Sequence, residues 1–557
     1  MSAAWTTHLF PGGVPLVYTM SLAGKPSTTQ WTIYRGIGTD GLHEIEFLAE
    51  IDPAAWGGGG ALIRQRSRLW CTDGLDPVRY TSEAQSTRLT LQFARDVVKI
   101  ELPDDTAQTI ARDSAEFIVD GNLPGQAALF YAELANRGSL RQPVSVRLFL
   151  VPQLVTVPSE IAPSEIALGK IPAAKDPSAS SGLWYRTSHR EDVLLDPQGR
   201  MLDVRIPHLG SECSLRRPGP SPPNWPEDLR SPSLTYAPPQ TAQFSIEDVS
   251  IAGPVTPIGA TLTIPRAIDP VGGVLFLSGS GTHDRHGISG EIDLGTHEIM
   301  DDLADHGFVG LRFDTRGAGS TRLGSDMLDR GLTSDIADAR ACLAFLRQRP
   351  EVAGRPLFLI GHSQGGMEAL ALANKKDVAP WLAGIVLMAA PGRTIDEVLA
   401  DQIVAQGETI GFTQEQIGRQ LEDLKQATRL VRSGRPWRPG EIPDWLLALF
   451  RTRTWYQEML SCDTRMLIAG VTCPALACQG GTDFQVSPTR DAEVLVAAAR
   501  SGNVDCGYAF FPGLDHLFKR SIGRSTLAEY YQPRPVDGAF LSRLRAWLDE
   551  RAGVIAA

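Results

Sequence analysis

The sequence lacks a long apolar run, a cluster of basic residues and a paired cysteine motif. In 557 residues with a net charge of −11, no apolar stretch approaches the roughly 20 residues of a membrane span. The acidic balance predicts neither nucleic acid nor an anionic membrane surface as a partner. The first residues have neither the basic nor the apolar region of a signal peptide, so we expect a cytoplasmic protein.

Cysteine is also sparse. The seven cysteines are scattered and show neither C-x-x-C nor zinc-ribbon spacing. This pattern predicts free thiols in a reducing compartment, since disulfide frameworks and structural zinc sites both need regularly spaced cysteines.

The length predicts two or more domains. Residues 1–217 contain short runs of alternating apolar and polar residues broken by Gly, Asp and Pro, which predicts a β-rich domain. No catalytic constellation is evident there. Residues 218–240 hold eight prolines, a composition typical of an extended linker. We place the domain boundary in this linker.

Residues 241–557 have a different sequence pattern, in which predicted apolar strands alternate with predicted helical segments. This predicts an α/β domain with a mostly parallel sheet covered by helices on both faces. Residues at about 393–463 are helical in pattern, with Thr413-x-x-Gln416 as one capping box. We expect this insertion to form a cap over the active-site edge of the sheet.

The pentapeptide Gly361-His362-Ser363-Gln364-Gly365 follows an apolar strand and precedes a helix-favouring segment. In this context G-x-S-x-G predicts a nucleophile elbow, a sharp turn that exposes the serine hydroxyl at the carboxyl end of the sheet. Ser363 is therefore the predicted nucleophile.

A serine nucleophile needs a histidine base, and the histidine needs an acid that fixes its tautomer. His516 and Asp483 each follow a late strand of the predicted sheet, where these groups are expected. Other residues compete for both roles, namely His362 for the base and Asp396, Asp491, Asp505 and Asp515 for the acid.

The oxyanion that forms during acyl transfer needs two backbone N–H donors. We expect one from Gln364 and the other from the loop SGSGTHDRHG, with Ser280 as the first choice and Gly281 as the second. His283 and His286 in this loop form an H-x-x-H pair, but no third ligand is evident and we expect no metal. Asp284 and Arg285 are expected to form a local ion pair.

The segments SGSGTHDRHG, FDTRGAGST, GHSQGG, GTDFQV and GLDHLF together resemble the α/β-hydrolase superfamily over about residues 243–553. Within it they are most similar to bacterial EstD-type carboxylesterases and serine aminopeptidase-like relatives. The resemblance implies the α/β-hydrolase fold and hydrolysis of a small-molecule carboxylic ester through an acyl-enzyme, without a cofactor. Many members have a His-Gly pair in the oxyanion loop, where this chain has Ser278-Gly279.

The sequence leaves several functions open. An ester, a lactone, a thioester and an amide present the same carbonyl, so an acyltransferase, an acyl-CoA thioesterase and a peptidase are alternatives. A binding protein that has kept the fold without catalysis is another. The oligomeric state is also open, with a homodimer as one possibility.

Overall fold

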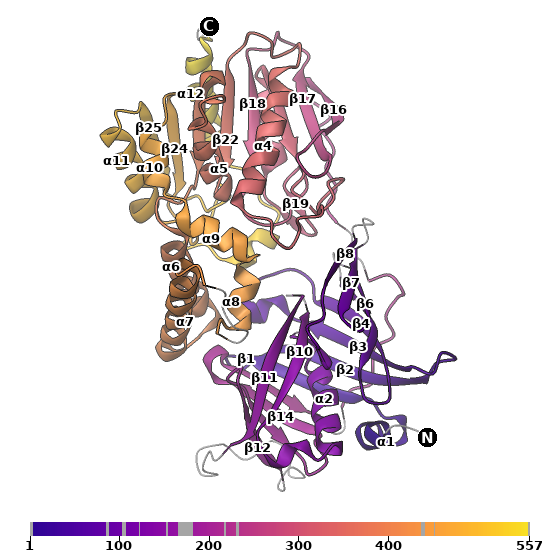
Figure 1. Cartoon of the computed structure of the whole chain (residues 1–557). Helices are drawn as coiled ribbons and strands as arrows, with labels where there is room; N and C mark the ends of the chain where they lie inside the picture. Colours follow the sequence, from indigo (N-terminus) through magenta and orange to yellow (C-terminus); the bar gives the residue numbers. More distant parts are fainter. Residues whose placement is uncertain are drawn as a thin grey trace. The chain divides into compact units, whose positions relative to one another are not determined.

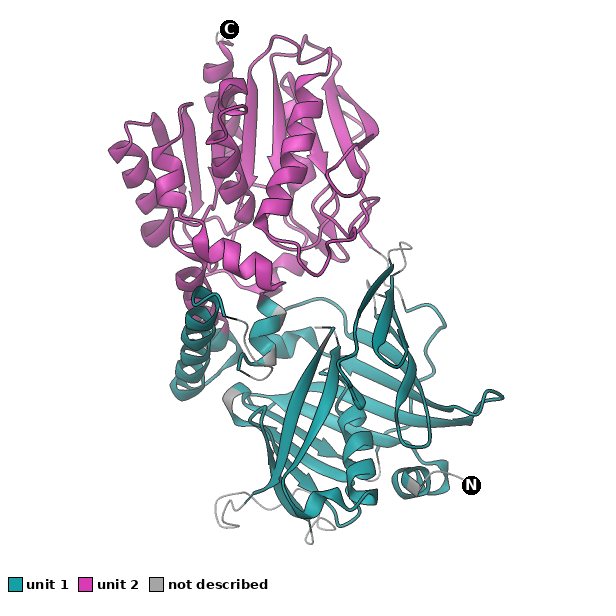
Figure 2. Ribbon diagram, viewed as in Figure 1, with its two compact units in different colours: residues 1–231, 407–449 teal, residues 232–406, 450–557 magenta. Residues whose placement is uncertain are grey.

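The computed structural model describes residues 4–84, 88–102, 107–121, 123–151, 154–164, 182–216, 219–229, 233–435, 441–450 and 452–554. The chain divides into two compact units (Figure 2). The first unit comprises Met1–Ser231 and Gly407–Leu449, and the second comprises Pro232–Gln406 and Phe450–Ala557. None of the described helices is long and apolar enough to cross a membrane.

The first unit is built on a 15-stranded sheet, almost entirely antiparallel. Its strands are β1 Leu16–Leu22, β2 Lys25–Ile37, β3 His43–Ile51, β4 Ile63–Cys71, β5 Pro77–Ala84, β6 Arg88–Phe93, β7 Val97–Glu101, β8 Ala107–Ala111, β9 Phe117–Asp120, β10 Val144–Val151, β11 Val155–Pro163, β12 Leu183–Thr187, β13 Asp192–Leu195, β14 Met201–Ile206 and β15 Ser211–Leu215. The prediction of a β-rich N-terminal part is confirmed.

This sheet curls around one helix, α2 Pro124–Asn136 (Figure 1). Its terminal strands β8 and β9 follow one another in the chain, and Phe93 of β6 contacts Phe149 of β10 with ring centroids 5.3 Å apart. Because these strands lie far apart in the sheet order, the contact brings the two ends of the sheet together. Helix α2 is buried on nearly all sides, as expected for a helix enclosed by a sheet. The sequence reasoning did not anticipate this helix.

Of the proline-rich segment the structure describes residues 219–229 and 233–240, neither of which forms a helix or strand, and residues 219–229 belong to the first unit. The indole N–H of Trp31 donates to the carbonyl of Pro220 at 2.9 Å. The guanidinium of Arg66 donates to the carbonyls of Pro226 and Glu227 at 3.0 and 2.9 Å. Backbone carbonyls that form no regular ladder are thereby satisfied by side chains of the sheet.

The second unit alternates strands and helices. Its elements are β16 Phe244–Ile251, β17 Ile258–Pro265, β18 Gly272–Leu277, β19 Ile288–Ser289, β20 Ile292–Asp293, α3 Thr296–Asp305, β21 Phe308–Phe313, α4 Leu332–Arg347, β22 Leu357–His362, α5 Gln364–Ala373, β23 Leu382–Met388, α6 Ile395–Ile410, α9 Arg453–Ser461, α10 Thr464–Ala469, β24 Ala475–Gly480, α11 Glu493–Ser501, β25 Cys506–Phe511 and α12 Gly538–Ala552.

The main sheet of this unit has the order β16-β17-β21-β18-β22-β23-β24-β25. The pairs β16–β17 and β17–β21 are antiparallel, and every later pair is parallel. Helices α4, α5, α10 and α11 share an apolar core with one face, whereas α3 and α12 pack on the other. The predicted α/β-hydrolase fold is confirmed. Its loops at the carboxyl ends of β18, β22, β24 and β25 meet at one edge.

The insertion between β23 and β24 is helical, as predicted, and its helices divide between the units. Helix α9 and most of α6 lie in the second unit, while α7 Gln414–Arg432 and α8 Asp444–Leu449 lie in the first. The capping box at Thr413 and Gln416 is present. Helix α7 is tied to the β-rich sheet of its unit by the ion pair between Arg190 and Asp423, at 2.6 Å.

Candidate active site

Ser363 occupies a strained turn between β22 and α5. Its φ of 53° and ψ of −118° lie in a region that residues other than glycine rarely adopt. The turn is held because the N–H of Ser363 donates to the carbonyl of Met388 at 2.8 Å, and its carbonyl accepts from Gly366 at 2.9 Å. This is the geometry expected of a nucleophile elbow.

The two glycines of the pentapeptide are required by space. A Cβ on Gly361 would lie 2.2 Å from the carbonyl oxygen of Gly365. A Cβ on Gly365 would lie 2.2 Å from the carbonyl oxygen of Leu277, at the end of β18. No side chain fits at either position, so the G-x-S-x-G pattern is dictated by close packing within the elbow and against the end of β18.

Asp483 and His516, which are 33 residues apart, are brought together in the loops after β24 and β25. Nδ1 of His516 is 2.8 Å from Oδ2 of Asp483, and both side chains are buried. The other carboxylate oxygen, Oδ1, accepts the backbone N–H groups of Gln485 and Val486 at 2.7 and 3.0 Å. A proton on Nδ1 leaves Nε2 of the same ring as an acceptor.

The rival carboxylates have other partners. Asp491 pairs with Arg393, Asp505 with Arg551 and Asp515 with Arg534. Asp396 lies in the first turn of α6. The carboxylate that accepts a hydrogen bond from the ring of His516 is that of Asp483.

The rival base, His362, has a structural contact. Its Nε2 is 2.9 Å from the backbone carbonyl of His516, to which it donates, and the two rings lie 4.7 Å apart. Burial, followed by the charges of His516 and His283 when these are protonated, lowers the pKa of His362 to about 3. A neutral imidazole that already donates through Nε2 braces the loop of His516.

The lowered pKa of His362 predicts a loss of stability in acid. In the unfolded chain His362 is protonated below about pH 6.5, whereas in the folded chain it stays neutral down to about pH 3. Protonation therefore favours the unfolded state, and the free energy of unfolding falls as the pH is lowered below 6.5. Between pH 7 and pH 5 the loss from this group is about 2 kcal/mol. In chemical denaturation, His362→Gln should lose less stability than the wild type over this interval by about that amount.

The matched control for this experiment is His306→Gln, because His306 is exposed. Its loss of stability between pH 7 and pH 5 should equal that of the wild type. Equal losses in the wild type and in His362→Gln would contradict the prediction.

The loop after β18 passes directly beside the elbow. A Cβ on Gly279 would lie 3.2 Å from Cβ of Ser363, so the loop approaches the serine as closely as glycine permits. The carbonyl of Gly279 is 3.1 Å from Nε2 of the buried His283, and Gly281 has a φ of 118°. Ser280 lies exposed between these glycines and lines the same cavity as Ser363.

Asp284 and Arg285, in the loop after β18, do not form the predicted ion pair with each other. Arg285 forms its close ion pair with the fully buried carboxylate of Asp314, at 2.6 Å. Asp284 instead accepts the backbone N–H groups of His286 and Ile288, each at 2.8 Å. The predicted local pair of Asp284 and Arg285 is wrong, because the side chains of sequence neighbours in this turn point to different partners.

A cavity of about 240 Å³ opens between these loops. It is lined by Gly279, Ser280, Gly281, Thr282, His283, Ser289, Ile292, Leu294, His362, Ser363, Gln485, His516, Leu517 and Tyr530. Among these described residues there is no aspartate, glutamate, lysine or arginine. The cavity thus combines hydroxyl, amide and imidazole groups with an apolar wall.

A metal site is not supported at the histidines of this loop. His283 contacts a carbonyl, whereas His286 stacks on Tyr236 with ring centroids 4.3 Å apart. Burial, then the charge of Arg312, lowers the pKa of His286 to about 4. The two histidines thus belong to separate networks.

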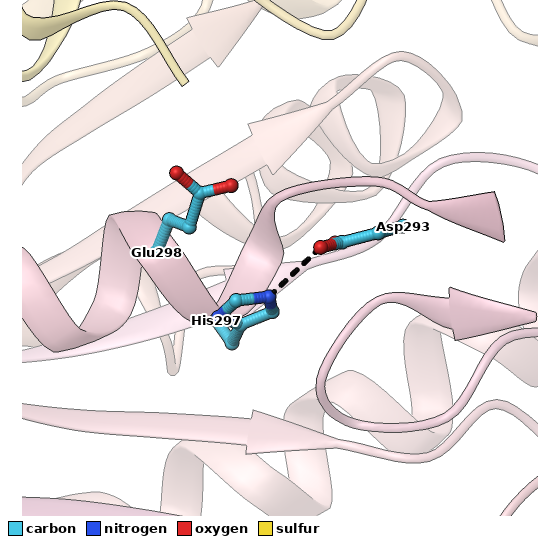
Figure 3. A group of neighbouring side chains, drawn as sticks. All are labelled: Asp293, His297 and Glu298. Atoms are coloured by element: carbon cyan, nitrogen blue, oxygen red, sulfur yellow. Dashed lines mark hydrogen bonds and ion pairs between the residues drawn. The ribbon is translucent and has the colours of Figure 1, made fainter. Parts of the chain in front are cut away.

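One cluster elsewhere in the described residues has ligand-type side chains close together, namely Asp293, His297 and Glu298 (Figure 3). Nε2 of His297 is 3.0 Å from Oδ2 of Asp293, and Glu298 accepts the N–H of Val536 at 3.0 Å. The ammonium group of Lys519 donates to the carbonyl of Asp293 at 2.7 Å. These hydrogen bonds connect the cluster to the segment that contains Lys519 and Val536.

Sequence reasoning missed several neighbours of the predicted triad. Gln479, buried at the end of β24, donates through Nε2 to Oδ2 of Asp483 at 3.0 Å. The signal was a polar residue closing an otherwise apolar strand. Tyr530, 14 residues beyond His516, could not be placed by any local pattern, yet it lines the cavity and contacts Gln485.

Comparison with known proteins finds sequences and structures that are similar to this chain. Residues 285–519, which include Ser363, Asp483 and His516, match the family model described as serine aminopeptidase, S33. Over 313 residues the chain is 25% identical to Esterase EstD of Thermotoga maritima, a match that covers 55% of this chain and 68% of that protein. The predicted resemblance to α/β hydrolases is confirmed, and with it the hydrolase class.

Similar solved structures include esterases as well. An esterase of Pyrococcus furiosus aligns with a TM-score of 0.38 and 14% identity, over 58% of this chain and 97% of that one. A thermostable carboxyl esterase of Bacillus coagulans aligns with a TM-score of 0.38 and 16% identity, over 55% of this chain and 99% of that one.

Proposed function

We propose, from the α/β-hydrolase fold of the second unit, that this protein is a serine hydrolase that cleaves a neutral carboxylic ester or lactone through an acyl-enzyme. Ser363 is the nucleophile, His516 the base and Asp483 the acid that orients it. The observation that carries the proposal is the 2.8 Å contact between Asp483 and Nδ1 of His516, beside a cavity that both Ser363 and His516 line. No cofactor is needed for this chemistry.

In the proposed reaction, Oγ of Ser363 attacks the ester carbonyl while Nε2 of His516 takes the hydroxyl proton. The imidazolium is stabilised by Asp483 and then gives that proton to the leaving alcohol. Water then attacks the acyl carbonyl and loses a proton to His516, and as the acyl–Oγ bond breaks His516 returns that proton to Oγ of Ser363 and the acid leaves. The backbone N–H groups of Gln364 and Ser280 are the proposed oxyanion donors, and the first N–H of a helix such as α5 has no acceptor within the helix.

The uncharged lining of the cavity supports a neutral substrate over the two main alternatives. An aminopeptidase must hold a positively charged amino terminus, and buried charge without a partner is costly. An acyl-CoA thioesterase or transferase must hold phosphates, for which arginine and lysine are the usual donors. The cavity offers none of these side chains among its described residues, so a neutral ester fits it better.

A substrate comparison tests this proposal. The protein should hydrolyse p-nitrophenyl butyrate with a kcat/KM at least about 10²-fold above that for alanine p-nitroanilide, since the ester carbonyl is the more reactive and the lining offers no partner for an ammonium group. Butyryl-CoA should be a poor substrate as well. A higher kcat/KM for the aminoacyl anilide would contradict an esterase and favour an aminopeptidase.

We further propose that the first unit supplies no catalytic group and that the substrate is a small molecule. The described residues contain seven free cysteines, which suits the predicted cytoplasmic location. The first unit has a cavity of its own, about 500 Å³ in volume and bordered by hydroxyl and carboxylate side chains of β1, β2 and β15. None of the residues that line this cavity belongs to the proposed triad.

A further inference from the structure

The side chain of Gln364 is held from three directions. Its Nε2 donates to Asp335 of α4 and to Glu368 of α5, each at 3.0 Å. Its Oε1 accepts the indole N–H of Trp455, from helix α9 of the insertion, also at 3.0 Å. Gln364, Asp335, Glu368 and Trp455 are all buried, which makes these hydrogen bonds difficult to exchange for water.

Helix α9 is itself fixed against the segment that leads into α4. The hydroxyl of Thr452 caps α9 by accepting the N–H of Trp455 at 2.9 Å, and it donates to the carbonyl of Arg330 at 2.6 Å. Glu458 accepts the N–H of Thr333 at 2.8 Å. Because Arg330 also contacts Asp335 at 2.7 Å, α9, the start of α4 and the side chain of Gln364 form one connected network.

The network matters because of where Gln364 lies in the chain. Its backbone N–H belongs to the peptide group that follows Ser363, a residue with strained φ and ψ. The direction of that N–H depends on ψ of Ser363 and φ of Gln364. Because both Nε2 and Oε1 of the Gln364 side chain are hydrogen-bonded, the range of φ open to Gln364 is limited. An oxyanion donor acts only when it is already aimed at the developing charge.

We propose that Trp455 is a positioning residue for catalysis: its indole N–H fixes the side chain of Gln364 and thereby aims the backbone N–H of Gln364 at the oxyanion. This inference rests on the proposed function. Helix α9 thereby supports the oxyanion hole from behind, through the side chain of Gln364, and is not proposed to contact the substrate. Displacing α9 releases the amide of Gln364 and weakens transition-state binding.

Trp455→Phe tests the proposal because it removes the N–H and keeps most of the ring. With p-nitrophenyl butyrate, kcat should fall about tenfold and KM should stay within about twofold, less than the 10²–10³-fold loss for a deleted oxyanion donor. The inhibition constant of a short aliphatic trifluoromethyl ketone, which binds as an oxyanion, should rise about tenfold. A purely structural residue would lower the melting temperature without this selective loss.

The matched control is Trp547→Phe. Trp547 is equally buried, lies on α12 at the opposite face of the sheet and packs edge-on against Phe358. It should lower the melting temperature and leave kcat and the ketone inhibition constant within about twofold. If Trp455→Phe changes kcat and that constant no more than this control, the proposal fails.

Gln364→Met is a second variant, which removes the acceptor of the Trp455 hydrogen bond at the nucleophile elbow. It should lower kcat at least about tenfold, since it removes the acceptor for Trp455 together with the hydrogen bonds to Asp335 and Glu368. The double variant with Trp455→Phe should lose no more than Gln364→Met alone, because the bond to Trp455 is already absent. Gln364→Met with unchanged kcat would refute the proposal even if Trp455→Phe does not fold. Ser363→Ala belongs in the same series: a retained rate in that variant would refute the proposed function itself.

Discussion

Replacing Ser363 with alanine should lower kcat for p-nitrophenyl butyrate by about 10⁴-fold or more, since the hydroxyl is the atom that forms the acyl-enzyme. The fold should persist, because Ser363 holds the elbow through its backbone N–H and carbonyl, and both remain in the alanine variant. A substrate analogue should still bind with a Kd within a few-fold of the wild type.

The control for Ser363→Ala is Ser542→Ala. Ser542 is exposed on α12, and its hydroxyl donates to the carbonyl of Gly538 at 2.8 Å and accepts from the guanidinium of Arg545 at 3.2 Å, both within the same helix. Its rate should equal that of the wild type. A Ser363→Ala variant that keeps more than about one tenth of the wild-type rate would exclude Ser363 as the nucleophile.

Asp483→Asn should lower kcat by about 10³–10⁴-fold with little change in shape. Its Oδ1 would keep the backbone N–H groups of Gln485 and Val486 as donors, which turns the new amide N–H₂ toward His516. Nδ1 of His516 must then accept, so the proton moves to Nε2. The imidazole in that tautomer cannot take the proton of Ser363.

The comparison variant is Asp505→Asn. Asp505 is another candidate acid in the sequence, but it is largely exposed and pairs with Arg551 at 2.9 Å. Exposed pairs of this kind contribute roughly 0–1 kcal/mol, so both stability and rate should stay close to wild type. If the two variants retain the same rate, Asp483 is not the acid.

Much of the second unit could be predicted because its signals are local. The elbow is encoded within five residues, since space alone demands glycine at positions 361 and 365. The positions of Asp483 and His516 follow from a rule of parallel sheets, that loops after successive strands share one edge. Apolar runs such as β22 mark those strands without ambiguity.

The features that were missed depend on contacts between residues far apart in the chain. Helix α2 is apolar on nearly every side, so it lacks the one-sided periodicity that identifies a surface helix. Arg285 pairs with Asp314, 29 residues away, rather than with its neighbour. The bond between Trp455 and Gln364 spans 91 residues. No spacing rule connects such positions before the fold is known.

The most direct test of the account is covalent labelling of the wild-type protein with a fluorophosphonate, followed by peptide mass mapping. We expect one adduct, on the peptide that contains Ser363, formed in step with loss of esterase activity and absent from Ser363→Ala. Stoichiometric labelling at another residue, or complete inactivation without an adduct on Ser363, would contradict it.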